Sequence, residues 1–238
     1  MKNDRETRAF LFDVHAEENE QNGTFITGEP IVFDQEEQLW DPVIGNYRES
    51  IDKRAMAETD LKDVRFLVGH NTAMIPLARS RNNNENSTMQ MKVGETGMGI
   101  RVNLDTENNA EARALYSAVK RGDMSGMSFM FTVDKDAWSD ADSDNPKRTI
   151  MSIRKVYEVS AVAFPAYSGT SIQAASEGEA LESVRASLES ARKQLAEERA
   201  AAEAAEEARQ AEEAAQERRR AVLERLEKLI KEVKQDEV

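Results

Sequence analysis

The sequence of 238 residues contains no cysteine. This absence excludes disulfide bonds, cysteine nucleophiles and metal sites built from thiolates, and it is compatible with a reducing compartment. The chain also lacks any run close to the roughly 20 apolar residues of a membrane-spanning helix, and no charged, then apolar, then small-residue leader opens it. We therefore expect the protein to stay in the cytosol of the cell that makes it, without a membrane partner.

Basic residues are in short supply. Lysine and arginine number 32 against 45 aspartates and glutamates, and the formal net charge is -13. Because neutralising phosphates requires an excess of lysine and arginine on some face, we expect no nucleic-acid partner. The rest of the composition, 39% hydrophobic and 32% charged, is typical of a soluble protein with one sizeable domain and an extension.

The residue types are distributed unevenly. Both tryptophans, all four tyrosines and all five prolines lie between Thr24 and Tyr167, whereas almost every residue from Glu177 onward is Ala, Glu, Arg, Lys, Gln or Leu. Only the earlier part can therefore build a mixed core. We predict a flexible arm at residues 1–23, or an edge strand around residues 9–14 within it, then a main domain at residues 24–176 and a helical tail at residues 177–238.

Alternation of apolar and polar residues predicts several β-strands. Residues 64–68 form a buried strand that delivers His70 at its end. Residues 88–93 and 99–104 alternate about a turn at 94–97, which is a hairpin pattern. Further strands are predicted at residues 24–33, as a strand pair or one bent strand, and at residues 127–133. Residues 149–157 and 159–164 are predicted as two more strands or as one bent strand. Many strands and few helices predict an α+β fold: a small, mostly antiparallel β-barrel core with flanking helices, followed by a long C-terminal helix.

Two helices are predicted inside the main domain. One runs from about residue 107 to 121, capped by Thr106 and ended by Gly122. A shorter one opens at residues 49–54 and continues through Met56. Between the last strands, residues 134–148 are rich in Asp, Ser and Asn, which predicts a surface loop.

The tail carries apolar residues at coiled-coil spacing near its two ends. Between the two stripes charged residues occupy the seam positions, so we predict one long helix that seeks partner helices. The stripes consist of Leu181, Val184, Leu188, Ala191 and Leu195, and of Val222, Leu226, Leu229 and Val233.

Histidine is scarce as well, because it occurs only at positions 15 and 70. Imidazole is the one side chain whose ordinary pKa, about 6.5, lets it take and return a proton near neutral pH. A hydroxyl nucleophile needs such a base, and the base needs an acidic partner that fixes its tautomer. Ser128 and Glu158 are our candidates for these two roles beside His70.

Each candidate has an alternative. A lone histidine at a strand end is often a structural residue, and His15 in its acidic segment is read as solvated rather than as a second catalyst. Ser125 is a rival nucleophile, three residues before Ser128. The alternatives for the acid are an exposed Glu158 paired with Arg154 or Lys155, and its replacement by Asp105 or Asp123.

No metal or cofactor is predicted. The cluster of Asp140, Asp142 and Asp144 resembles a calcium loop only superficially. It lacks the glycine and the distal bidentate glutamate at the spacing that such loops use.

Three segments together resemble the tailed-bacteriophage prohead proteases, the capsid-maturation serine peptidases distantly similar in fold to the herpesvirus assemblins. They are Phe66-Leu67-Val68-Gly69-His70-Asn71, then Arg121-Gly122-Asp123-Met124-Ser125-Gly126-Met127-Ser128-Phe129, then Glu158-Val159-Ser160-Ala161-Val162-Ala163-Phe164-Pro165-Ala166. The resemblance covers about residues 24–171 and leaves the tail outside. Two positions depart from the family's usual pattern: Asn71 stands where an aspartate commonly follows the histidine, and Met130 stands where a glycine commonly follows Ser-Phe.

The resemblance implies a serine endopeptidase with Ser128 as nucleophile and His70 as general base, and Glu158 is our choice for the residue that orients His70. It implies no cofactor. Its substrates and partners would be the major capsid protein precursor, that precursor's scaffolding segment and the protease itself, inside the assembling prohead in the host bacterial cytoplasm. Self-association through the tail is a further expectation. A non-catalytic scaffold or assembly chaperone with a degenerate protease-like domain is the alternative function, and an intracellular peptidase unrelated to phage is a third.

Overall fold

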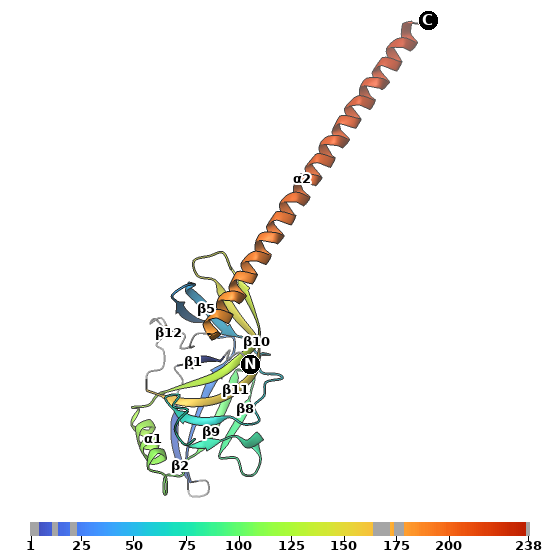
Figure 1. Cartoon of the computed structure of the whole chain (residues 1–238). Helices are drawn as coiled ribbons and strands as arrows, with labels where there is room; N and C mark the ends of the chain where they lie inside the picture. The colour runs from blue at the N-terminus through green and yellow to red at the C-terminus, as the bar shows by residue number, and fades with distance from the viewer. Residues whose placement is uncertain (1–4, 11–13, 20–22, 164–171, 174–178, 237–238) are drawn as a thin grey trace. The chain divides into compact units, whose positions relative to one another are not determined.

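Two β-sheets and two helices organise the chain in the computed structural model, which describes residues 5–10, 14–19, 23–163, 172–173 and 179–236 (Figure 1). The larger sheet has the strand order β1-β10-β11-β5-β4-β12, with β6 paired to β11 and to β7. Its strands are β1 (Glu6–Phe10), β4 (Glu37–Asp41), β5 (Gly45–Ile51), β6 (Arg65–Val68), β7 (Ala78–Arg79), β10 (Gly126–Ser139), β11 (Lys147–Val162) and β12 (Ile172–Gln173).

The smaller sheet has the strand order β2-β3-β9-β8. These strands are β2 (His15–Asn19), β3 (Gly23–Val32), β8 (Met89–Val93) and β9 (Gly97–Asn103). The predicted hairpin is confirmed, because β8 and β9 pair antiparallel around the turn. The α+β class is also confirmed. The barrel is not: within the described ranges neither sheet closes on itself. Alternation along a strand reports which face is buried, but closure depends on tilt and stagger, which no single strand encodes.

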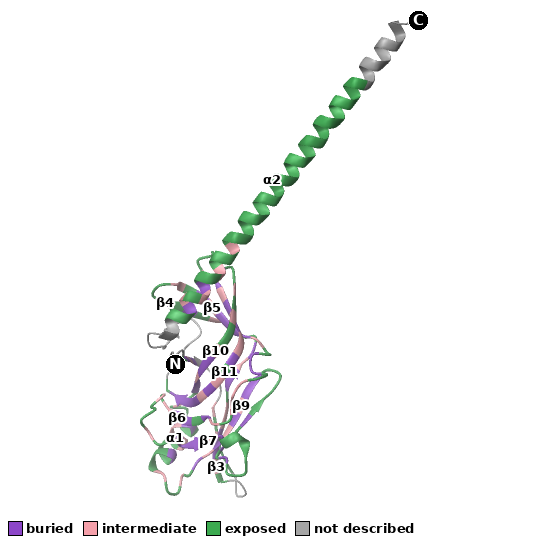
Figure 2. Cartoon of the chain, turned by 45° about the vertical axis from the view of Figure 1, so that its right-hand side comes forward, coloured by how far each residue is buried: buried purple, intermediate pink, exposed green. Residues whose placement is uncertain are grey.

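The longest strand pair, β10 with β11, joins the parts of the larger sheet. The two strands run antiparallel, with register shifts between Met130 and Val133 and around Lys135. Phe129 and Phe131 project from β10 into the core, where their rings stack 4.6 Å apart and have no exposed surface. Buried residues accordingly run along β10 and β11 in Figure 2.

The helix α1 (Ala110–Arg121) begins later than expected. Asn109 caps it by accepting hydrogen bonds from the backbone N–H groups of Glu111 and Ala112. Thr106, the predicted cap, instead lies 3.0 Å from the hydroxyl of Thr24. The predicted end is confirmed, since Gly122 adopts the left-handed conformation at φ 82° that favours glycine. The remaining short element is the 3-10 helix η1 (Arg81–Asn83).

Two sequence predictions fail, one of them in part, at the far ends of β10 and β11. The loop expected at residues 134–148 is confirmed only at residues 140–146, because β10 continues to Ser139 and β11 begins at Lys147. The helix expected from residue 49 is absent, because residues 45–51 form β5 and residues 53–58 form turns. The cause is a buried cluster of charged side chains, which resembles a solvated surface when only the sequence is read.

That charged cluster consists of Glu6, Arg8, Glu49, Asp136 and Arg148. The guanidinium of Arg148 bonds Glu6 at 2.7 Å, Glu49 at 2.9 Å and Asp136 at 2.6 Å. Arg8 bonds Glu6 at 2.7 Å and Glu49 at 2.5 Å. Because every carboxylate meets at least one guanidinium, the cluster avoids the large cost of an unpaired buried charge.

Two compact units divide the chain, residues 1–191 and 192–238, so the first turns of α2 (Glu179–Asp236) belong to the first unit. There Val184 and Leu188 are buried, and the guanidinium of Arg185 bonds Asp41 at 2.8 Å. These contacts fix the start of the helix on the sheet.

The second unit is the rest of α2. Its side chains from residue 192 onward are largely exposed as far as they are described, up to Leu226 (Figure 2). Pairs such as Arg220 with Glu224 support the helix along its surface. Leu229 and Val233 lie beyond the described side chains, so the coiled coil stays a prediction. Within the described residues, no helix combines the length and the apolar character needed to cross a bilayer.

Candidate active site

His70 is mounted just beyond the end of β6. This strand runs parallel to β11 with Leu67 beside Ser160, and the backbone N–H of Gly69 continues the ladder to Ala161 at 2.9 Å. Gly69 and His70 then both take positive φ angles, 59° and 58°. A left-handed backbone conformation is uncommon for residues other than glycine, and such conformations are found preferentially at functional sites. The turn ends the strand and leaves the imidazole beside the sheet.

Ser128 and Glu158 come from the neighbouring strands β10 and β11. The register places Ser128 opposite Ser160 and Met130 opposite Glu158. Because side chains two residues apart on a strand share a face, Ser128, Glu158 and Ser160 lie on the same side of the sheet. The three segments singled out in the sequence thus meet at one place.

The imidazole of His70 bridges the two other candidates. Its Nε2 lies 2.7 Å from Ser128 Oγ, and its Nδ1 lies 2.6 Å from Glu158 Oε1. Ser128 has no exposed surface and Glu158 is 2% exposed, while the histidine side chain keeps 24%. With Glu158 ionised, Nδ1 donates its hydrogen to the carboxylate, which leaves Nε2 as the nitrogen able to accept a proton from the hydroxyl.

Ser160 is a fourth member that the sequence reasoning missed. Its hydroxyl donates to Glu158 Oε2 at 2.5 Å and accepts the backbone N–H of His70 at 3.1 Å. It therefore holds both the acid and the base while remaining fully buried. The signal was present in the sequence, since Ser160 follows Glu158 by two positions and must share its face of the strand.

The two rival residues, Ser125 and His15, do not occupy the positions beside the ring nitrogens of His70. Ser125 is exposed ahead of β10, and both ring nitrogens of His70 already face Ser128 and Glu158. His15 sits on β2 in the other sheet, opposite Thr27, and is exposed.

The alternatives for the acid have their own partners too. Arg154 bonds Asp134 and Lys155 bonds Asp60, so neither pairs with Glu158. Of the substitutes, Asp123 pairs with Arg121, and Asp105 accepts hydrogen bonds from Asn108.

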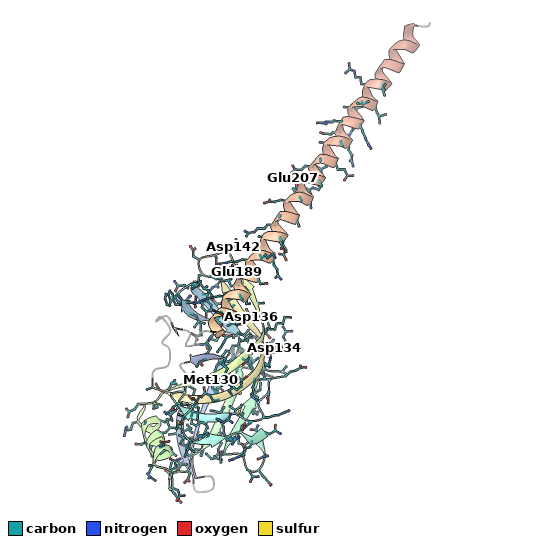
Figure 3. The ribbon with its side chains drawn as sticks, in the orientation of Figure 1. Met130, Asp134, Asp136, Asp142, Glu189 and Glu207 are labelled. Carbon is teal, nitrogen blue, oxygen red and sulfur yellow. The ribbon has the colours of Figure 1, made fainter. Side chains whose placement is uncertain are left out.

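A pocket of about 330 Å³ opens beside this group, and Glu158 and Met130 form part of its wall. Figure 3 labels Met130 on β10, followed along the strand by Asp134 and Asp136. Arg5 closes another part of the wall, with its guanidinium 4.2 Å from the ring centre of Tyr157. The space next to the acid is large enough to admit an amino-acid side chain.

Ala9 of β1 is paired with Ser128, and Arg8 is one residue away along the strand, so the charged cluster lies on the opposite face of β1 from the site. Burial alone would raise the pKa of Glu6, but Arg148 and Arg8 outweigh it and hold that pKa below its ordinary value. For Arg148, burial opposes the charge, yet Glu6 and Glu49 raise its pKa. Burial also raises the pKa of the neighbouring Tyr47 phenol. The opposite charges thus favour the ionised forms of Glu6 and Arg148 despite their burial.

Comparison with protein families identifies the family of the chain. A family model described as Caudovirus prohead serine protease matches residues 11–184, which is most of the chain. The chain belongs to this prohead serine protease family. The match contains His70, Ser128 and Glu158 and extends beyond the 24–171 region that the motifs indicated, while β1 precedes it.

One solved structure is similar at a low level. It is titled "Structure of the bacteriophage T4 capsid assembly protease, gp21", with 10% identity, coverage of 67% of this chain and 99% of that one, and a TM-score of 0.33. Similarity this low supports no inference about fold or function. No curated protein matches the sequence significantly.

The two residues that depart from the prohead protease pattern, Asn71 and Met130, lie in different surroundings. Asn71 Oδ1 accepts the backbone N–H of Ala73 at 3.1 Å, which closes a tight turn after the histidine. Met130 is half-buried in the pocket wall. The first substitution therefore stabilises a turn, whereas the second shapes the space beside Glu158. The end of the third motif, from Phe164 to Ala166, lies outside the described residues.

Proposed function

We propose that this chain is a serine endopeptidase in which Ser128 is the nucleophile, His70 the general base and Glu158 the residue that orients the base. The observation that carries the proposal is the imidazole of His70, hydrogen-bonded at one nitrogen to a serine and at the other to a buried carboxylate. A base that is oriented by a third group and lies within bonding reach of a hydroxyl is the arrangement that activates a weak nucleophile.

In the first half of the reaction, Oγ of Ser128 attacks the carbonyl carbon of the peptide while its hydrogen passes to Nε2 of His70. The negative charge of Glu158 stabilises the imidazolium that forms. The C–N bond then breaks, and Nε2 returns the proton to the leaving amine. This leaves an ester between Ser128 and the acyl part of the substrate.

In the second half, water takes the place of the amine. Nε2 of His70 removes a proton from the water, the resulting hydroxide attacks the ester carbon, and Oγ of Ser128 leaves with that proton. The enzyme returns to its initial state, and the net change is the hydrolysis of one peptide bond.

The substrates we propose are the major capsid protein precursor with its scaffolding segment, and the protease itself. Membership of the prohead serine protease family supports this class of substrate. The long exposed helix of α2 fits the same setting, because an Ala-rich helix with apolar stripes can pair with other helices. We propose that it carries the enzyme into the assembling prohead, in the host bacterial cytoplasm, through scaffold helices or further copies of itself.

The proposal is tested by coexpressing the full chain with the capsid precursor and measuring the intact mass of both. The parent should clip the precursor and its own chain. Ser128→Ala should lower this clipping by about ten-thousandfold or more, as is typical when one member of such a triad is removed. Ser125→Ala is the matched control, since it removes an exposed serine from the same segment.

Clipping by Ser128→Ala at the parental rate would show that the nucleophile is misassigned. If neither protein clips itself or the precursor, the non-catalytic scaffold becomes the better reading. Cleavage of unrelated proteins but not of the capsid precursor would favour a general intracellular peptidase.

A further inference from the structure

The outer edge of β10 next to Ser128 is occupied by the chain's own strand β1. We propose that this edge is the binding site for the substrate, an extended peptide that adds to the sheet as a strand, and that β1 covers it as an internal competitor until it is displaced. This inference rests on the proposed function, because it assigns a purpose to the surface around the nucleophile.

The first observation is the cover over the nucleophile. β1 pairs antiparallel with β10 from Glu6 beside Phe131 to Phe10 beside Met127, with Ala9 directly opposite Ser128. Ser128 has no exposed surface, although His70 next to it does. No peptide carbon can reach Oγ from this edge while β1 is in place.

The second observation concerns the single hydrogen of the Ser128 hydroxyl. Oγ lies 2.7 Å from the carbonyl oxygen of Arg8 and 2.7 Å from Nε2 of His70. A hydroxyl donates one hydrogen only. When Arg8 accepts it while Nδ1 donates to Glu158, Nε2 can bond Oγ only if the imidazole carries a hydrogen on both nitrogens, and such an imidazolium accepts no proton from the nucleophile. The docked strand thus holds the pair in a non-productive arrangement.

The way β1 binds indicates what can replace it. Its contacts with β10 are those of one extended strand on another, and a peptide carbonyl of β1 already lies at the nucleophile. Extended peptides recognise sheet edges in this manner, with backbone hydrogen bonds for affinity and side-chain pockets for selection. The pocket bounded by Met130 and Glu158 lies beside this edge and would receive one such side chain.

The buried charges of β1 allow a substrate peptide to replace this strand. β1 brings Glu6 and Arg8 to the buried cluster, one charge of each sign, so its departure leaves the net charge of the remainder unchanged. Glu49 and Asp136 would still both contact Arg148. Glu49, Asp136 and Arg148 thus each keep a partner, which avoids the largest cost of opening a buried ion network. β1 also precedes residues 11–184, the part matched by the family model.

A disulfide lock tests the inference in the full-length protein. Thr7 and Met130 are directly opposite in the register, and the chain has no cysteine that would compete. Opposed residues of an antiparallel pair have Cα atoms roughly 4.5–5.5 Å apart, within the range that a disulfide spans. Thr7→Cys/Met130→Cys is oxidised or reduced, and the rate of labelling of Ser128 by a fluorophosphonate is measured together with peptide hydrolysis.

We expect the oxidised protein to label and hydrolyse at least about tenfold more slowly than the same protein after reduction. Comparing one variant in two redox states cancels any effect of replacing Met130. Met130→Cys alone cannot form the lock and should respond to neither treatment. Equal rates for the oxidised and reduced double variant would overturn the inference.

A second variant acts in the opposite direction. Arg8→Met removes two buried ion pairs of β1 and leaves the backbone of the strand intact, so labelling of Ser128 should rise about tenfold or more. Arg154→Met is the matched control, because it removes an exposed pair with Asp134. Slower or unchanged labelling of Arg8→Met would count against displacement of β1.

The two proposals fail in distinguishable ways. If the parent, the reduced double variant and Arg8→Met all leave Ser128 unlabelled and cleave no peptide, the proposed function fails. If they react at Ser128 but the lock changes nothing, the serine peptidase stands and only the role of β1 is wrong.

Discussion

Replacing Ser160 by alanine tests how the acid and the base are held in position. The hydroxyl is fully buried and makes two contacts, as donor to Glu158 at 2.5 Å and as acceptor of the His70 backbone N–H at 3.1 Å. Ser160→Ala removes both without enlarging any side chain. Glu158 then loses the hydrogen bond to its second oxygen, and the turn that presents the imidazole loses its anchor.

The size of the effect follows from these two bonds. A hydrogen bond to a charged group contributes about 1.5–3 kcal/mol. If the transition state loses that much stabilisation because the carboxylate is less well oriented, kcat falls by about 10- to 150-fold, at 1.4 kcal/mol for each factor of ten. KM should change little, because Ser160 has no exposed surface with which to touch substrate.

The assay compares Ser160→Ala with a matched variant, Ser80→Ala. Ser80 is 1% exposed and makes two comparable bonds, accepting from the backbone N–H of Val64 at 2.9 Å and donating to the carbonyl of Leu61 at 3.2 Å. Both variants should lose stability by about 1–3 kcal/mol, measured by thermal unfolding. Only Ser160→Ala should lose kcat in initial-rate measurements with a peptide substrate.

Two results would refute this reasoning. If Ser160→Ala keeps the kcat of Ser80→Ala, the hydroxyl contributes to folding alone. If both variants lose kcat equally, the loss reports general destabilisation rather than positioning of Glu158 and His70.

Three further predictions address the pocket, the charged cluster and the boundary of the first unit. Met130→Gly should enlarge the pocket and shift kcat/KM about tenfold toward peptides with bulkier side chains near the cleaved bond, and an unchanged ranking across a peptide series would contradict this. The pKa of Glu6 is held below its ordinary value of 4.5, so the stabilisation that the ionised carboxylate provides is complete above pH 4.5 and is lost as the pH falls through the lowered pKa. The free energy of unfolding, measured against pH, should therefore fall in this acid range for the parent, and Glu6→Gln should weaken the fall. Deleting residues 192–238 should change the stability of the first unit by less than about 0.5 kcal/mol, whereas truncation from residue 177 also removes the buried Val184 and Leu188 and should cost roughly 3–6 kcal/mol.

The local setting of each candidate residue was predictable from the sequence, whereas their meeting was expected only from the resemblance to the prohead proteases. Residues 64–68 read as a strand, so His70 was expected at its end, and β6 ends two residues before it. Ser128 and Glu158 were expected on strands, and they lie on β10 and β11. What no single strand shows is which strands are neighbours. The register that places Ser128 opposite Ser160 depends on the whole sheet.

The two secondary-structure elements that sequence reasoning misjudged, the long loop at residues 134–148 and the helix from residue 49, share one physical cause. Glu49, Asp136 and Arg148 are charged, and charged residues are almost always solvated unless they are paired. The sequence around them therefore reads as loop or exposed helix. Pairing between residues as distant as Glu6 and Arg148 reverses this, because ions that neutralise one another can be buried within strands. The pairing is a property of the tertiary structure and produces no periodic pattern in the sequence.

The same pairing determines how β1 can move. Glu6 and Arg8 are two residues apart on one strand, so they face the cluster together when β1 docks. If only one of them withdrew, a buried charge would lose a partner, and breaking such a pair costs about 3–5 kcal/mol. Full docking pairs both charges and full release returns both to water, so the intermediate position is the least stable of the three. The cover over Ser128 should therefore be either closed or open, with few molecules in between, and labelling of Ser128 should report the fraction that is open.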